Sequence, residues 1–146
     1  MAKKSSYQAA HNIISFKHKL ERVKNLFSDK GYTVSYSYDE FTSVCPKTGL
    51  PDFGTIYIDY TPKKWVIEEK SMKFYLISYR NVGIFKEFAA VKILSDFVEI
   101  TKPKWARLVG EFKSRGGLPS TVRLEFKNNK IVEIIPDLHQ NKHNFI

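Results

Sequence analysis

The sequence predicts one α+β domain built on a mainly antiparallel sheet. Two observations predict this class: strand patterns of period two occupy both ends of the region from 31 to 135, and two helical patterns lie between them. Strands, then a helix pair, then strands are typical of an antiparallel sheet covered on one face. With 146 residues, 42% of them hydrophobic, the chain fits one such domain. We expect an N-terminal extension over residues 1–30 and a single domain over residues 31–146.

The N-terminal extension has helical periodicity. Between His11 and Lys30, apolar residues recur at alternating spacings of three and four, and Gly31 follows as a candidate C-cap; they are Ile13, Phe16, Leu20, Val23 and Phe27. This spacing predicts an amphipathic helix over residues 11–30.

Three strands are predicted next. Residues 31–38 alternate tyrosine and valine with serine and threonine, a period of two that is rich in strand-forming residues. The stretch FTSVCPKTGLPDFG, residues 41–54, contains two prolines and two glycines and predicts a loop. This loop leads to a second strand over residues 55–60 and then to a third around 65–67.

Two helices and a C-terminal group of strands complete the predicted domain. Apolar residues at helical spacing predict a helix around residues 72–79 and another over 85–98, and Pro103 ends that run. Strand patterns resume over residues 105–112 and 120–126. Asn128-Asn129 then predicts a hairpin turn into a last strand over 130–135.

Composition excludes several classes of protein. No apolar stretch approaches the roughly 18 residues that a spanning helix needs, so we expect no membrane partner and a cytoplasmic location. One cysteine cannot form an internal disulfide, and the four histidines show no metal-ligand spacing, so no metal is expected. A net charge of +9 fits either a polyanion partner or a solvated lysine-rich surface.

Cys45 is the first candidate for chemistry. A lone cysteine is more often a small buried hydrophobe than a nucleophile. Cys45, however, stands in a loop rich in proline and glycine, with Lys47 two residues on and Asp52 seven on, so that a thiolate and a proton-exchanging carboxyl group can meet there. Asp52 also fits an ordinary turn residue, since Pro-Asp is common in turns.

Basic residues form two further candidate sites. Lysines 63, 64, 70 and 73 and Arg80 are interleaved with aromatic residues, a pattern that suits a phosphate-bearing ligand, a polynucleotide or a solvated helix face. Arg115-Gly116-Gly117 joins two strand patterns, where glycines let backbone amides approach an anion and arginine pairs with phosphate.

Two blocks, FTSVCPKTGLPDFGTIYIDY and EEKSMKFYLISYRN, together resemble the QueF family of NADPH-dependent 7-cyano-7-deazaguanine reductases in content, order and spacing. The resemblance covers residues 32–122. It implies a tunnelling fold with a four-stranded antiparallel sheet and two helices on one face. It also implies a homo-oligomer, a pentameric barrel or two stacked pentamers, with active sites between subunits.

The resemblance also implies roles for individual residues. Cys45 attacks the nitrile carbon to form a thioimide, Asp52 transfers protons, and NADPH is the cofactor. Glu87 pairs with the guanine-like edge of the substrate, as a carboxylate accepts two hydrogen bonds from adjacent N–H donors. Glu68, Glu69 and Phe85 complete the substrate pocket. The residues implied for the cofactor are Lys70, Ser71, Lys73, Arg80, Arg115 and Gly116.

Two positions depart from the reductase pattern. Lys86 stands where these reductases usually have histidine, which leaves a longer cation in the catalytic position, and Glu69 stands where they usually have serine. Two alternatives to a free-base reductase therefore stay open. One is a related enzyme, a reductase or an amidinotransferase, that acts on the base within tRNA or DNA. The other is a non-catalytic binder of deazaguanines or nucleic acid.

Overall fold

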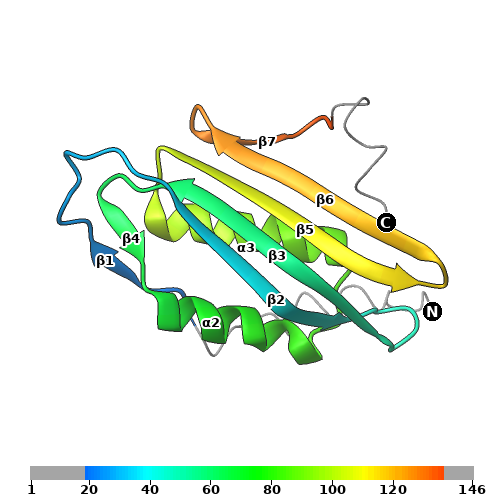
Figure 1. The fold of residues 1–146 in the computed structure, drawn as a ribbon. Helices are drawn as coiled ribbons and strands as arrows, with labels where there is room; N and C mark the ends of the chain where they lie inside the picture. The colour runs from blue at the N-terminus through cyan, green and yellow to red at the C-terminus, as the bar shows by residue number, and fades with distance from the viewer. Residues whose placement is uncertain (1–18, 137–146) are drawn as a thin grey trace, which may run out of the picture.

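The computed structural model describes residues 19–136, which form a sheet with two helices against one face (Figure 1). In chain order the elements are β1 (Arg22–Lys24), β2 (Val34–Val44), β3 (Pro51–Thr61), β4 (Trp65–Ile67), α2 (Glu69–Ile77), the 3₁₀ helix η1 (Ser78–Asn81), α3 (Lys86–Thr101), β5 (Trp105–Arg115), β6 (Leu118–Lys127) and β7 (Lys130–Glu133). The predicted α+β class and the order strands, helices, strands are confirmed.

The main sheet is antiparallel throughout, with the strand order β2-β3-β5-β6-β7. Its five described strands exceed the four implied by the resemblance. The fifth, β7, is the strand that the Asn128-Asn129 turn predicts: both asparagines have positive φ, 52° and 60°, as a type I′ hairpin turn requires. β1 and β4 form a separate two-stranded sheet.

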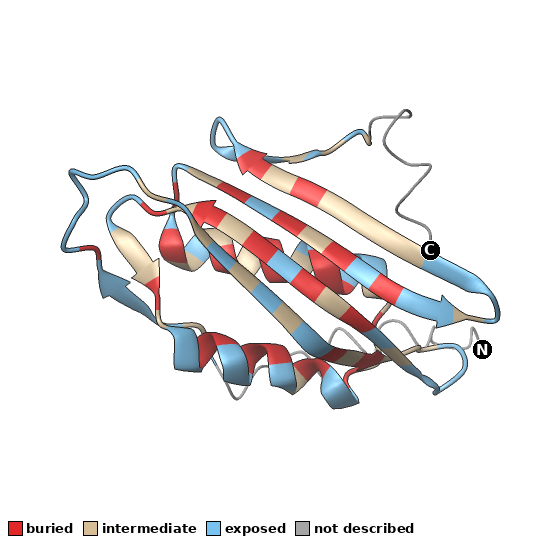
Figure 2. Ribbon diagram, in the orientation of Figure 1, coloured by how far each residue is buried: buried red, intermediate tan, exposed pale blue. Residues whose placement is uncertain are grey.

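The core lies between the sheet and the helices. Along β3, Ile56, Ile58 and Tyr60 are buried and alternate with more accessible residues, as Figure 2 shows by its banded strands. α3 covers this face with a buried stripe at helical spacing, and its Phe97 meets the Tyr60 ring edge-on at 4.8 Å. The residues that alternate along β3 and those at helical spacing on α3 therefore pack together in one core.

The helix predicted over residues 11–30 is wrong in its described part, and residues 11–18 lie outside the described residues. Arg22–Lys24 instead form β1, which pairs antiparallel with β4. Val23 and Phe27, two residues of the expected apolar stripe, are 47% and 63% exposed. The segment pairs with β4 instead of forming a helix because buried Asn25 donates to the carbonyls of Lys63 and Lys64. These two bonds hold the segment against the loop before β4. β1 thus lies before the expected domain boundary at residue 31.

The loop predicted over residues 41–54 is shorter than expected. β2 continues to Val44 and β3 begins at Pro51, so the turn covers residues 45–50 only. Proline is compatible with the first position of a strand. Gly54 has a packing reason to lie within β3: a Cβ there would stand 2.6 Å from the Glu111 carbonyl oxygen. Of the two prolines and two glycines in the predicted loop, Pro51 and Gly54 therefore belong to β3.

Candidate active site

Cys45 is the first residue after β2 and begins a tight loop. Its backbone N–H donates to the Leu50 carbonyl at 2.8 Å, and its carbonyl accepts from the Gly49 N–H at 2.9 Å. Gly49 has a φ of +70°, which glycine adopts without strain. These bonds close the loop and leave the Cys45 side chain partly accessible.

The loop favours the thiolate form of Cys45. The Thr48 hydroxyl, followed by the backbone N–H groups of Thr48 and Lys47, lowers the pKa of this thiol below its ordinary value. Partial burial and the negative charge of Asp52 act in the opposite direction but do not cancel this effect. Because the thiolate is the nucleophilic form, the loop prepares Cys45 for attack on an electrophile.

Asp52 and Arg115 meet beside this loop. Asp52 lies on β3, and only 11% of its side chain is exposed. Its Oδ1 lies 3.4 Å from Nη1 of Arg115. Arg115 Nη1 also donates to Thr48 Oγ1 at 3.4 Å, and Nη2 donates to the Pro51 carbonyl. Gly116 and Gly117 follow in a turn with φ of 59° and 83°. The Arg-Gly-Gly turn is therefore placed at the cysteine loop.

The beginning of α3 is fixed beside the same strand end. Val44 N–H donates to the Val82 carbonyl, and Ile84 N–H donates to the Val44 carbonyl, both at 3.0 Å. Because Cys45 follows Val44, this bridge brings Phe85, Lys86 and Glu87 to the region of the cysteine loop. The first turn of α3 contains Lys86, whose Nζ lies 5.8 Å from the centre of the Phe112 ring, and Glu87, which is exposed.

A second group of predicted site residues gathers at the beginning of α2. Glu68 caps this helix by accepting from Lys70 N–H at 3.0 Å and Ser71 N–H at 2.7 Å, and its pKa is lowered by the Ser71 N–H first and the Lys70 N–H second. Glu69 pairs with Lys73 at 3.5 Å. Lys70 and Lys73 are both exposed.

These two groups lie far apart within one chain. Burial, followed by the charges of Glu69 and Glu68, raises the pKa of Tyr36, so both carboxylates act near that part of β2. Cys45 is nine residues further along, roughly 30 Å for an extended strand. One chain therefore brings together Cys45, Asp52, Arg115 and the beginning of α3, and it leaves the α2 group elsewhere.

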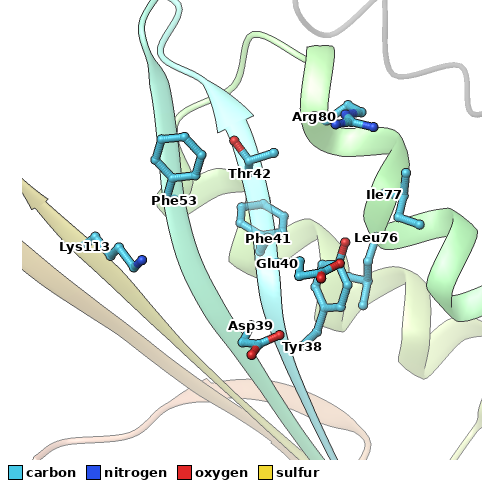
Figure 3. A pocket seen from close by; sticks show the side chains of 10 residues that line it. All are labelled: Tyr38, Asp39, Glu40, Phe41, Thr42, Phe53, Leu76, Ile77, Arg80 and Lys113. Carbon is cyan, nitrogen blue, oxygen red and sulfur yellow. The ribbon is translucent and has the colours of Figure 1, made fainter.

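Arg80 belongs to neither group. It lies in η1 beside a hollow of about 420 Å³ whose other lining residues are Tyr38, Asp39, Glu40, Phe41, Thr42, Phe53, Leu76, Ile77 and Lys113. Figure 3 shows Arg80 on the helix side of β2 and Lys113 on the other side, beyond β3. Two cations thus border a hollow that also contains two carboxylates.

Comparison with known proteins shows the family to which this chain belongs. The sequence profile described as QueF-like protein matches residues 51–131. This chain belongs to the QueF family. The NADPH-dependent 7-cyano-7-deazaguanine reductase of Chloroherpeton thalassium is 47% identical over 111 residues, which span 76% of this chain and 96% of that protein. The protein of the same name from Elusimicrobium minutum is 51% identical over 98 residues, covering 67% and 74%.

A solved structure supports the same fold. The apo crystal structure of an archaeosine synthase described as QueF-Like superposes with a TM-score of 0.57 over 65% of this chain and 91% of that chain, at 22% identity. The tunnelling fold implied by the sequence is confirmed at the level of class. Within residues 19–136, no three His, Cys, Asp or Glu side chains form a metal-binding group, and none of the helices is long and apolar enough to span a membrane.

Sequence reasoning did not single out two residues that lie beside Cys45 and Asp52. The Thr48 hydroxyl is the first cause that lowers the pKa of the Cys45 thiol, and its position between Cys45 and the loop glycine was an available signal. Ser43 lies opposite Asp52 in the β2–β3 register, is fully buried, and its Oγ has no hydrogen-bond partner among the described atoms. No local pattern distinguished Ser43 from an ordinary strand residue.

Proposed function

We propose that this protein reduces the nitrile of 7-cyano-7-deazaguanine to the primary amine of 7-aminomethyl-7-deazaguanine, with NADPH as reductant. The observation that carries the proposal is the Cys45 loop: a thiol with a lowered pKa beside a nearly buried carboxyl group. It occurs in a chain whose most similar relatives include reductases named for this reaction. Nitrile carbon is the electrophile that such a thiolate attacks.

The chemistry divides between Cys45 and Asp52. The Cys45 thiolate adds to the nitrile carbon while the nitrile nitrogen gains a proton, which gives a covalent thioimide. Bound NADPH would supply two hydrides in succession, and with protons delivered at nitrogen and sulfur the products would be the amine and the free Cys45 thiol. Asp52 is the carboxyl group within reach of the loop and serves as the proton carrier. Lys86 adds positive charge beside the developing negative charge on nitrogen.

Recognition of the base falls to carboxylates and aromatic rings. Glu87 is exposed in the first turn of α3, so its two oxygens are available for adjacent N–H donors of a guanine-like edge. Phe85 precedes it and packs edge-on against Phe88 at 5.5 Å between ring centres, which holds an aromatic surface next to Glu87. Glu68 and Glu69 approach the base from another side.

The basic residues suit the cofactor phosphates. NADPH supplies hydride when it is bound, and the side chains that would hold its phosphates are Lys70, Lys73, Arg80 and Arg115. Lys70 and Lys73 are exposed and stand one turn apart on α2. The N–H groups of Lys70 and Ser71 already bond to Glu68, so the lysine side chains rather than the helix backbone are the groups that reach an anion.

A complete site requires a second copy of the chain. Because the α2 group lies roughly 30 Å along β2 from Cys45, we propose that a neighbouring subunit supplies it, in a pentamer or decamer. Mixing provides the test: Cys45→Ala subunits and Lys70→Ala/Lys73→Ala subunits are each inactive alone. Co-expressed, they regain part of the activity if the sites are shared. No recovery in mixed oligomers would place the whole site in one chain.

The reaction is tested by NADPH absorbance together with mass spectrometry of the protein. We expect NADPH oxidation that requires 7-cyano-7-deazaguanine and disappears in Cys45→Ala, while Cys45→Ala keeps the wild-type oligomer size. Oxidation that persists in Cys45→Ala would refute the thioimide route. A Cys45 adduct formed without loss of NADPH would instead point to amidine formation or to a base carried in a nucleic acid.

A further inference from the structure

Arg115 makes more contacts to the cysteine loop than an anion-binding side chain needs. Its guanidinium donates to Thr48 Oγ1, donates to the Pro51 carbonyl and lies 3.4 Å from Asp52 Oδ1. These partners are 63 to 67 positions away in sequence, so Arg115 ties the end of β5 to the loop that follows β2. Only 31% of its side chain is exposed. The planar guanidinium, with five N–H donors, suits such multiple contacts.

Thr48 receives two of the bonds that define the loop. Its Oγ1 accepts from the Leu50 N–H at 3.2 Å and from Arg115 Nη1 at 3.4 Å. A hydroxyl group has two acceptor lone pairs and one hydrogen to donate. These two contacts fix the Thr48 side chain within the loop, and its hydroxyl is the first cause that lowers the pKa of the Cys45 thiol.

We propose that Arg115 is a positioning residue for the nucleophile: its guanidinium holds the Thr48 side chain and Asp52 in place at the Cys45 loop. The inference rests on the proposed role of Cys45 and adds a role to the phosphate contact expected of Arg115. Gly116 and Gly117, whose positive φ values turn the chain, follow the arginine directly.

Other charges surround the loop and must be separated from this effect. They come from the loop itself, from β3, from β5 and from the beginning of α3; the residues are Lys47, Asp52, Arg115, Lys86 and Glu87. Removing the Arg115 charge changes the electrostatics at Cys45 whatever Thr48 does. Removing it in a Thr48→Val background changes the electrostatics alone. A double-mutant cycle therefore isolates the part of the effect that Arg115 exerts through Thr48.

The test measures alkylation of Cys45, the only cysteine of the chain, by iodoacetamide between pH 6 and pH 10, with neither NADPH nor nitrile present. At pH 7 we expect alkylation to slow about tenfold in Thr48→Val and about threefold in Arg115→Met, because fewer molecules hold the thiolate. In the Thr48→Val background, Arg115→Met should slow alkylation by a clearly smaller factor, because only the electrostatic part of the effect remains. Near pH 10 all rates should converge, since every thiol is then ionised.

Matched variants control the interpretation. Arg107→Met removes an arginine that pairs with an aspartate across the same two strands, and it should leave alkylation unchanged. Thr48→Ser retains the hydroxyl, and its alkylation rate should depend on pH as that of the wild type does. Rates that still differ near pH 10 would indicate altered access to the thiol rather than altered ionisation, and they would overturn the proposal.

Two further results would also overturn it. One is an Arg115→Met profile equal to wild type; the other is an equal slowing by Arg115→Met with and without Thr48. Because alkylation needs neither substrate nor cofactor, its outcome is independent of reductase activity. A chain that shows the expected cycle but never oxidises NADPH would refute the proposed function and leave the role of Arg115 standing.

Discussion

Two arginine–aspartate pairs join β5 to β3, and they are built differently. Arg107 meets Asp59 directly across the strands, with Nε at 3.2 Å and Nη2 at 2.7 Å from one carboxylate oxygen, and Ser35 donates to the other oxygen at 2.5 Å. Arg115 lies 3.4 Å from Asp52 and divides its remaining donors between Thr48 and Pro51. The first pair is a closed structural contact, whereas the second connects the Asp52 carboxyl group to the loop of Cys45, the proposed nucleophile.

The difference indicates which aspartate is available for chemistry. Asp59 has its acceptor positions filled by strong donors, and such a carboxylate exchanges protons poorly near neutral pH. Asp52 has one long contact in a more buried position, 11% against 21% exposed, so its carboxylate oxygens are less fully occupied by donors than those of Asp59. The same type of residue pair thus closes a structural contact at one end of the sheet, and at the other end it lies at the loop where we propose that the reaction occurs.

The largest expected effect separates these two aspartates. Asp52→Asn removes the proton carrier but keeps the side-chain shape, and we expect kcat to fall about 100-fold or more, in the range of lost acid–base catalysis. Asp59→Asn, the matched control, should keep kcat within about twofold. Steady-state NADPH oxidation measures both. Comparable losses in the two variants would mean that the effect of Asp52→Asn is structural.

A smaller effect separates the two arginines. Arg115→Met should raise KM for NADPH about tenfold, because a charged phosphate contact is lost, and lower kcat by a few-fold through Thr48. Arg107→Met should change neither constant appreciably, because its partner is Asp59. Initial rates over a range of NADPH concentrations distinguish the cases. A fall in kcat with KM unchanged would remove Arg115 from the cofactor site and leave only its positioning role.

The sequence predicted the parts of this comparison that depend on local pattern. Alternation identified β3 and β5, and the Pro-Gly loop brought Cys45 and Asp52 together as candidates. What sequence could not supply was register. Arg115 reaches Thr48 only because the β3–β5 pairing places the end of β5 beside the cysteine loop, and no pattern in either segment specifies that alignment. The expected helix over residues 11–30 failed for a related reason, since long-range pairing with β4 outweighed a local period.

The smallest expected effect concerns stability and pH. Burial raises the pKa of Asp59, but the hydrogen bonds from Ser35 and Arg107 and the Arg107 charge lower it by more, so its folded-state pKa lies below the unfolded value. The stability from this pair is therefore present above the unfolded pKa, near 3.9, and is lost as pH falls through the folded-state pKa. At pH 7, Asp59→Asn should lower the free energy of unfolding by about 1 kcal/mol. Urea unfolding of both proteins should show this difference shrinking below pH 4. A difference in the free energy of unfolding that stays constant down to pH 2 would assign the lost stability to packing. The contrast between an ionic structural pair at Asp59 and the pair at Asp52 would then fail.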